Sequence, residues 1–126
     1  MHTYHGSCHC GAVRFEIETE AIDTVIECNC SICHKKGALF HRVPEESFRL
    51  LAGEDALTLY QFNKRIAHHT FCRHCGIYPF HRPRSEPDSY RVNVRCLDDY
   101  DLTASAPEVF HFDGQNWEDS FAALNQ

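Results

Sequence analysis

The cysteines constrain this chain more than any other feature of its sequence. Seven of the eight fall into three short clusters, and Cys96 stands alone; the clusters are Cys8-His9-Cys10, Cys28-Asn29-Cys30-Ser31-Ile32-Cys33 and Cys72-Arg73-His74-Cys75. The N-terminus lacks the basic and apolar regions of a secretory signal, so we expect a cytoplasmic protein, in which disulfides are rare. Closely spaced cysteines in a reducing compartment are typical of metal ligands.

Spacing divides the clustered cysteines into two kinds of site. The pairs Cys8/Cys10 and Cys72/Cys75 together supply four thiolates, the closed tetrahedral set of a structural zinc site. The glycine that directly follows each pair can adopt the positive φ that a tight metal-binding turn often needs. Such a site would join the N-terminal strand to the middle of the chain. The alternative is a set of buried thiols or redox disulfides, although thioredoxin-like chemistry requires a βαβ context that the sequence lacks.

The remaining cluster supplies three thiolates, from Cys28, Cys30 and Cys33, and leaves a fourth tetrahedral position open. Open three-ligand sites are where zinc performs chemistry, so we predict a second zinc here, with these three cysteines as the catalytic residues. Two alternatives stay open for this triplet. The thiols can oxidise to a disulfide and one free thiol, or they can bind zinc only when a substrate supplies the fourth ligand.

Ten histidines offer competing metal ligands. His9 and His74 lie within the paired clusters, where we expect them on the solvent side of each turn. His34 follows the triplet directly, and its alternative role is an acid–base group that lines the open site. For Cys96, which follows a strand, we expect a buried free thiol, with a role near the site as the alternative.

Short apolar segments with alternating polarity predict a mainly β fold. The segments with strand character are 13–17, 24–28, 39–43, 48–53, 57–62, 66–71, 90–94 and 109–112. Their spacing implies mainly antiparallel sheets, with a hairpin that turns at Asn63-Lys64. Only the C-terminus looks helical, because Trp117, Phe121 and Leu124 fall at i, i+4 and i+7. We expect residues 1–126 to form a single domain.

Composition argues against two classes of partner. The formal net charge is −6 and the basic residues are scattered, whereas nucleic-acid binders need clustered Lys and Arg. No apolar run approaches the roughly 18 residues of a membrane span. We therefore expect a protein that binds neither nucleic acid nor membrane; the sequence leaves its oligomeric state open.

The succession CHCGAVRFE, CNCSIC, TFCRHCG and CLDD, followed by a tail that contains tryptophan, resembles the glutathione-dependent formaldehyde-activating enzyme family. The stretches CNCSICHKKG, LYQFN and HHTFCRHCG are especially similar to the branch that includes centromere protein V. The resemblance implies several small coiled antiparallel sheets. It also implies a structural zinc at the four paired cysteines and a second zinc at the triplet.

In activity, the resemblance implies a carbon–sulfur lyase that condenses formaldehyde with glutathione to S-hydroxymethylglutathione. An open zinc suits this chemistry because it can deprotonate a thiol or polarise an aldehyde. Candidates for a clamp on the carboxylates of glutathione are confined to five arginines: Arg42, Arg49, Arg65, Arg91 and Arg95. Two other functions stay open, a carrier that binds a small thiol without turning it over and a structural zinc module that mediates protein contacts.

Overall fold

The structure is a computed structural model that describes residues 1–62 and 64–119. Strands dominate the described part of the chain: β1 (His2–Ser7), β2 (Arg14–Thr19), β3 (Thr24–Cys28), β4 (Phe40–Pro44), β5 (Phe48–Ala52), β6 (Leu57–Tyr60), β7 (His68–Cys72), β8 (Phe80–Arg82), β9 (Ser89–Asn93) and β10 (Glu108–Phe112). The prediction of a mainly β fold is therefore confirmed.

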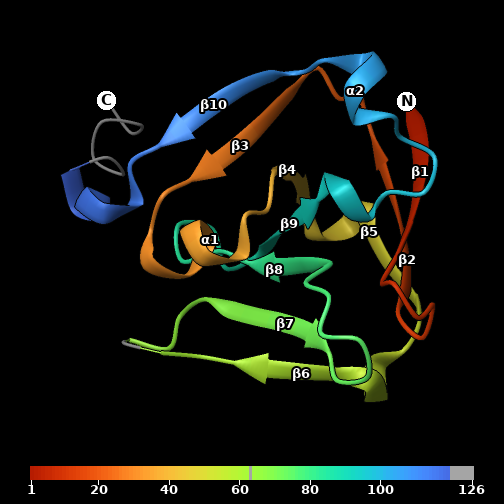
Figure 1. The fold of residues 1–126 in the computed structure, drawn as a ribbon, viewed down its shortest axis with the longest axis horizontal. Helices are drawn as coiled ribbons and strands as arrows, with labels where there is room; N and C mark the ends of the chain where they lie inside the picture. The colour runs from red at the N-terminus through yellow and green to blue at the C-terminus, as the bar shows by residue number, and fades with distance from the viewer. Residues whose placement is uncertain (63, 120–126) are drawn as a thin grey trace.

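The strands form two sheets (Figure 1). One has the order β1-β2-β5, and the other has the order β10-β3-β4-β9-β8-β7-β6. In Figure 1, β1 and β2 run along one side of the molecule, the β6–β7 hairpin forms the lower edge, and β3 and β10 form the upper edge. Neighbouring strands are antiparallel except β3 and β10, which run parallel over residues 24–28 and 108–112.

The helical segments are short: α1 (Ser31–Lys36), α2 (Leu102–Ser105) and the 3-10 turns η1 (Glu45–Ser47), η2 (Glu54–Ala56), η3 (Val94–Cys96) and η4 (Gly114–Asn116). At the C-terminus, residues 117–119 are helical as expected, while Phe121 and Leu124 lie outside the described residues. None of the helices in the described ranges is long and apolar enough to cross a bilayer.

Helix α1 corrects the expectation that only the C-terminus is helical. Its ends are fixed by capping: Cys30 Sγ accepts a hydrogen bond from Cys33 N–H, and Gly37 ends the helix in the left-handed conformation, at φ 66°. Six residues are too few to show an apolar stripe of helical period, so periodicity could not reveal this helix.

The core draws on both sheets and centres on Phe15 of β2. Its ring stacks on Phe48 at 5.6 Å between centroids and meets the edge of Phe80 at the same distance. Val13, Phe15 and Ile17 are all fully buried, as their alternation predicts. Across the sheet, Gly6 is in register with Phe15, and any Cβ at Gly6 would overlap the phenylalanine ring. The close approach of β1 therefore depends on that glycine.

We expect Phe15→Ala to lower the free energy of unfolding of the metal-loaded protein by about 3–5 kcal/mol, because it opens a cavity where three aromatic rings meet. The control is Leu51→Ala on β5, where the side chain is 51% exposed and truncation should change stability by less than about 0.5 kcal/mol. Urea unfolding with equal m-values measures both. Equal losses for the two variants would contradict this account of the core.

Candidate metal centres and the cavity beside them

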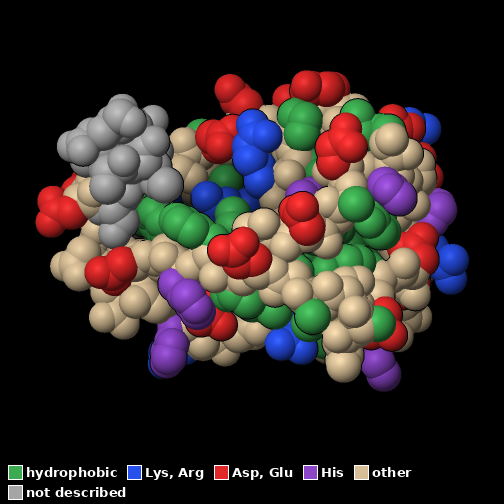
Figure 2. Space-filling view, turned by 90° about the horizontal axis from the view of Figure 1, so that it is seen from above, with side chains coloured by type: hydrophobic (Ala, Val, Ile, Leu, Met, Phe, Trp, Pro, Cys, Tyr) green, Lys and Arg blue, Asp and Glu red, His purple; other side chains and the backbone are tan. Residues whose placement is uncertain are grey.

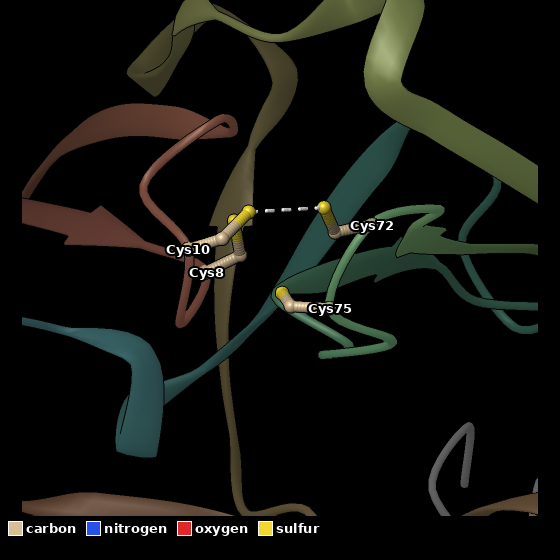
Figure 3. A group of neighbouring side chains, drawn as sticks. All are labelled: Cys8, Cys10, Cys72 and Cys75. Carbon is tan, nitrogen blue, oxygen red and sulfur yellow. Dashed lines mark hydrogen bonds between the residues drawn. The ribbon is translucent and has the colours of Figure 1, made fainter.

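The two cysteine pairs converge from distant parts of the chain. Cys8 and Cys10 follow β1, Cys72 ends β7, and Cys75 lies in the next turn; their four Sγ atoms all lie within 4.8 Å of one another. Figure 3 shows the four thiols directed at a common point from two separate turns. The sulfurs of Cys8 and Cys10 are 3.6 Å apart, and those of Cys10 and Cys72 are 3.7 Å apart. Zinc–sulfur bonds of about 2.3 Å give a tetrahedral edge of about 3.8 Å, so the geometry fits a zinc ion.

Backbone hydrogen bonds shape both turns. Gly11 N–H donates to the carbonyl of Cys8, and Gly76 N–H donates to that of Cys72, at 3.2 and 2.7 Å. Both glycines have positive φ, 81° and 76°, as their positions after the pairs predict. Val13 N–H also donates to Cys8 Sγ at 3.3 Å, a bond that favours a thiolate there.

The cysteine triplet, Cys28, Cys30 and Cys33, also forms a compact group, with all three Sγ atoms within 4.8 Å of one another. Cys28 ends β3, Cys30 caps α1 and Cys33 lies inside that helix. Hydrogen bonds with the other two thiols lower the pKa of Cys30, and hydrogen bonds with Cys28 and Cys30 raise the pKa of Cys33. A bound cation would favour ionisation of all three sulfurs.

The turn after β10 forms a seat for the triplet. A Cβ on Gly114 would lie 2.6 Å from both Cys28 Sγ and Cys30 Cβ, so only glycine fits against these cysteines. The bond from Asn29 N–H to the Phe112 carbonyl spans 3.3 Å, and the bond from Gln115 N–H to Asn29 Oδ1 spans 3.2 Å. The close approach of Gly114 to the triplet depends on the pairing of β3 with β10.

The triplet opens on a cavity of about 580 Å³. Five cationic side chains line this cavity, and no Asp or Glu of the described residues does; the cations are Lys35, Lys64, Arg65, Arg84 and Arg91. On the face shown in Figure 2, acidic side chains are scattered among basic and hydrophobic ones. Arg84 forms an ion pair with Glu118 at 2.6 Å, so the other four cations make the cavity locally positive in a chain with a net charge of −6.

Of the five arginines considered for a carboxylate clamp, only Arg65 and Arg91 line the cavity. Arg42 binds Glu86 through a contact of 2.6 Å, and Arg49 pairs with Glu16 at 3.2 Å. Arg95 is exposed outside the cavity. Sequence reasoning missed Arg84, whose guanidinium lies 3.7 Å from the ring centroid of Trp117 at the cavity wall.

Two buried histidines, His69 and His81, line the cavity and were missed from the sequence. Their rings stack at 5.2 Å, and His69 Nδ1 lies 2.7 Å from the Tyr78 hydroxyl. Burial lowers the pKa of both imidazoles, so both are neutral near pH 7. Their one sequence signal is their position inside strands that also carry buried residues.

The three histidines that lie within or beside the cysteine clusters are all exposed. His9 and His74 are exposed, and neither belongs to the groups of sulfurs that could hold a metal. His34 is exposed and lines the cavity. A polar group beside the open triplet is therefore available at His34, as the alternative for that residue requires.

Cys96 is a buried free thiol, as expected. Burial raises its pKa to about 12, and its thiol donates to the Tyr78 carbonyl across 3.9 Å. A buried thiol with so high a pKa is a poor nucleophile.

Two comparisons with known proteins agree with this arrangement. Residues 3–114 match the sequence model of a family described as glutathione-dependent formaldehyde-activating enzyme. The fold is similar to the crystal structure of a Rhodobacter sphaeroides protein, with 40% sequence identity and a TM-score of 0.77. That likeness covers 83% of this chain and 97% of the bacterial one. The matched region contains both groups of cysteines and the turn that seats the triplet.

We expect Gly114→Ala to weaken metal binding at the triplet at least about tenfold while leaving the four-cysteine centre loaded, because the new methyl group would displace Cys28 or Cys30. Metal content after dialysis against a weak chelator should fall from two ions to one, as in the triple serine variant of the triplet. Gln115→Ala is the control, since it keeps the backbone N–H that binds Asn29. If Gly114→Ala retained two ions, Gly114 would not be needed for metal binding at the triplet.

Proposed function

Because the chain belongs to the glutathione-dependent formaldehyde-activating enzyme family, we propose that it is a zinc-dependent, carbon–sulfur lyase-like enzyme. It would form or cleave the adduct of an aldehyde with a small thiol, such as S-hydroxymethylglutathione. The observation that carries this proposal is the position of the triplet, an open set of three cysteine sulfurs at a positively lined cavity.

The cysteines divide the metal chemistry between them. Cys8, Cys10, Cys72 and Cys75 would hold a structural zinc, and the triplet would hold a second one. When bound at the triplet, zinc supplies a Lewis acid that keeps thiols ionised at neutral pH. The chain's own contribution there is to fix three sulfurs between α1 and the Gly114 turn and to leave the cavity side open.

The cavity suits an anionic thiol of the size of glutathione. Its volume of about 580 Å³ falls in the range of small-molecule pockets, roughly 300–1,000 Å³. Lys35, Lys64 and Arg65 are exposed at this cavity, where they can pair with the carboxylates of a bound tripeptide. The absence of Asp and Glu from the described lining removes the charges that would repel such a substrate.

The reaction itself needs no further reagent. The thiol loses its proton, and the sulfur electron pair forms a bond to the aldehyde carbon. The π electrons of the C=O bond move to the oxygen, which then takes up a proton and becomes the hydroxyl of the adduct. The cavity accelerates this addition, or its reversal, by holding sulfur and aldehyde in contact.

Two further expectations accompany this function. Thiolates that must stay reduced favour the cytoplasm as the place of action. The positive charges lie inside a cavity of small-molecule size, which favours a small thiol over nucleic acid as the partner.

We expect the zinc-loaded protein to accelerate the formation of S-hydroxymethylglutathione from formaldehyde and glutathione, followed by exchange NMR at equilibrium. Cys30→Ser should remove the acceleration because it takes away one of the triplet sulfurs. Cys96→Ser is the matched control and should keep the wild-type rate, since Cys96 lies outside both sulfur groups.

Exchange NMR together with titration calorimetry distinguishes an enzyme from a thiol carrier. Titration calorimetry that finds glutathione bound at the triplet, with no acceleration in exchange NMR, would replace the enzyme by a thiol carrier. If glutathione does not bind and the reaction is not accelerated, the remaining function is that of a structural zinc module.

We expect Lys35→Gln to raise the KM for glutathione roughly two- to five-fold, since an exposed ion pair contributes up to about 1 kcal/mol. The increase should shrink at high salt because salt screens exposed charges. Lys36→Gln is the control, since this neighbour on α1 does not line the cavity. An equal KM for both variants, measured in steady state at low and high salt, would remove Lys35 from substrate binding.

A further inference from the structure

Two buried polar atoms beside the triplet have no hydrogen-bond partner among the described residues: His81 Nδ1 and Arg91 Nε. A buried donor or acceptor that is left unpaired costs about 1–3 kcal/mol, and native proteins leave few of them. Both residues line the cavity into which the triplet opens. A ligand that enters this cavity can supply the partner that both atoms lack.

The sheet brings these two residues together. His81 on β8 and Arg91 on β9 are directly opposite in the antiparallel register. Opposite residues in such a pair project from the same face of the sheet, with Cβ atoms about 5 Å apart. One small acceptor can therefore reach both side chains.

Aromatic packing fixes the His81 ring. It meets Phe40 at 4.6 Å and stacks on Tyr78 at 5.5 Å and on His69 at 5.2 Å, and only 3% of the residue is exposed. Because burial keeps this imidazole neutral, it can donate one hydrogen bond from Nδ1 in the corresponding tautomer. Its position does not have to change when a ligand binds.

Arg91 is a cation without a carboxylate of its own. It forms no ion pair within residues 1–62 and 64–119, where its guanidinium donates from Nη2 to Ser85 Oγ at 3.2 Å. The nearby carboxylate of Glu86 accepts three hydrogen bonds from Arg42 instead, at 2.6 to 3.0 Å. The guanidinium therefore stays available for negative charge that arises in the cavity.

We propose that His81 Nδ1 and Arg91 Nε bind the oxygen of the aldehyde as it becomes negatively charged during carbon–sulfur bond formation. This inference rests on the proposed function. As the thiolate forms its bond to the aldehyde carbon, the π electrons of the C=O bond move onto this oxygen, and a proton then converts it to the hydroxyl. Fixed donors at such an oxygen stabilise the transition state more than the ground state.

The burial of the two donors favours the aldehyde oxygen over a carboxylate of the thiol. His81 is buried and Arg91 is half-buried, whereas Lys35, Lys64 and Arg65 are exposed at the same cavity. A flexible tripeptide would place its carboxylates at those exposed cations, which leaves the buried donors to the smaller one-carbon aldehyde.

Formate, which has one carbon and negatively charged oxygens, is a stable probe of this site. We expect NMR titration to show formate bound to the zinc-loaded protein, with a change in the His81 ring nitrogen signals. His81→Phe keeps the ring, Arg91→Gln keeps a polar side chain, and each should weaken formate binding about tenfold or more. Arg95→Gln, an exposed arginine outside the cavity, should bind as the wild type does. Unchanged binding in both cavity variants would overturn the proposal.

Kinetic measurements distinguish binding of the aldehyde oxygen from binding of a carboxylate oxygen of the thiol. For variants with full metal content, kcat should fall about 10²-fold while the KM for the thiol stays the same. The loss should be equal with glutathione and with 2-mercaptoethanol, a thiol without carboxylates. A loss confined to glutathione would mean that Arg91 binds a carboxylate, and the proposal would be wrong.

Different results would contradict the oxygen site and the proposed reaction. If the wild type accelerates the reaction and both variants have the same rate as the wild type, the proposed oxygen site is wrong. The proposed enzymatic function is then unaffected. If the wild type gives no acceleration, the proposed reaction fails, and the formate titration alone decides whether His81 and Arg91 bind such an oxygen. If either variant misfolds, the test rests on the wild type alone. His81 ring nitrogen signals that do not shift when formate is added would then overturn the proposal.

Discussion

The convergence of four sulfurs from two turns is the constraint on which the rest of the structure depends. Cys10 and Cys72 are 62 residues apart in the chain, and their sulfurs lie 3.7 Å from each other. Closing a loop of this length has an entropic cost, and four adjacent thiols repel once they ionise, so a bound cation would offset both. The centre joins the first sheet to the end of β7, directly beside the core in which Cys8 and Cys72 are buried.

The triplet reaches its geometry by another route. Its three sulfurs come from one short stretch of chain, but their seat comes from the turn after β10. The parallel pairing of β3 with β10 joins these two parts. One centre is thus built from two distant pairs of ligands, and the other from local ligands with a distant support.

Local features could be predicted from the sequence, and features that depend on register could not. Cysteine spacing indicated both sulfur groups, since ligand spacing within a turn is a local property, and alternation indicated most strands. Helix α1 was missed because a cysteine cap and Gly37 define it rather than an apolar period. The sequence could not predict that His81 and Arg91 meet, because their meeting depends on how β8 pairs with β9. Arg42 and Arg49, equally plausible from the sequence, bind surface carboxylates instead.

The late position of Gly114 in the chain has a consequence for how the protein is assembled. During synthesis the triplet emerges before Cys72 and Cys75, yet the residue that completes its seat emerges after both. N-terminal parts of a chain can fold first as it leaves the ribosome. The four-sulfur centre therefore has all its ligands on the nascent chain while the triplet still lacks its support, so the two centres need not form together.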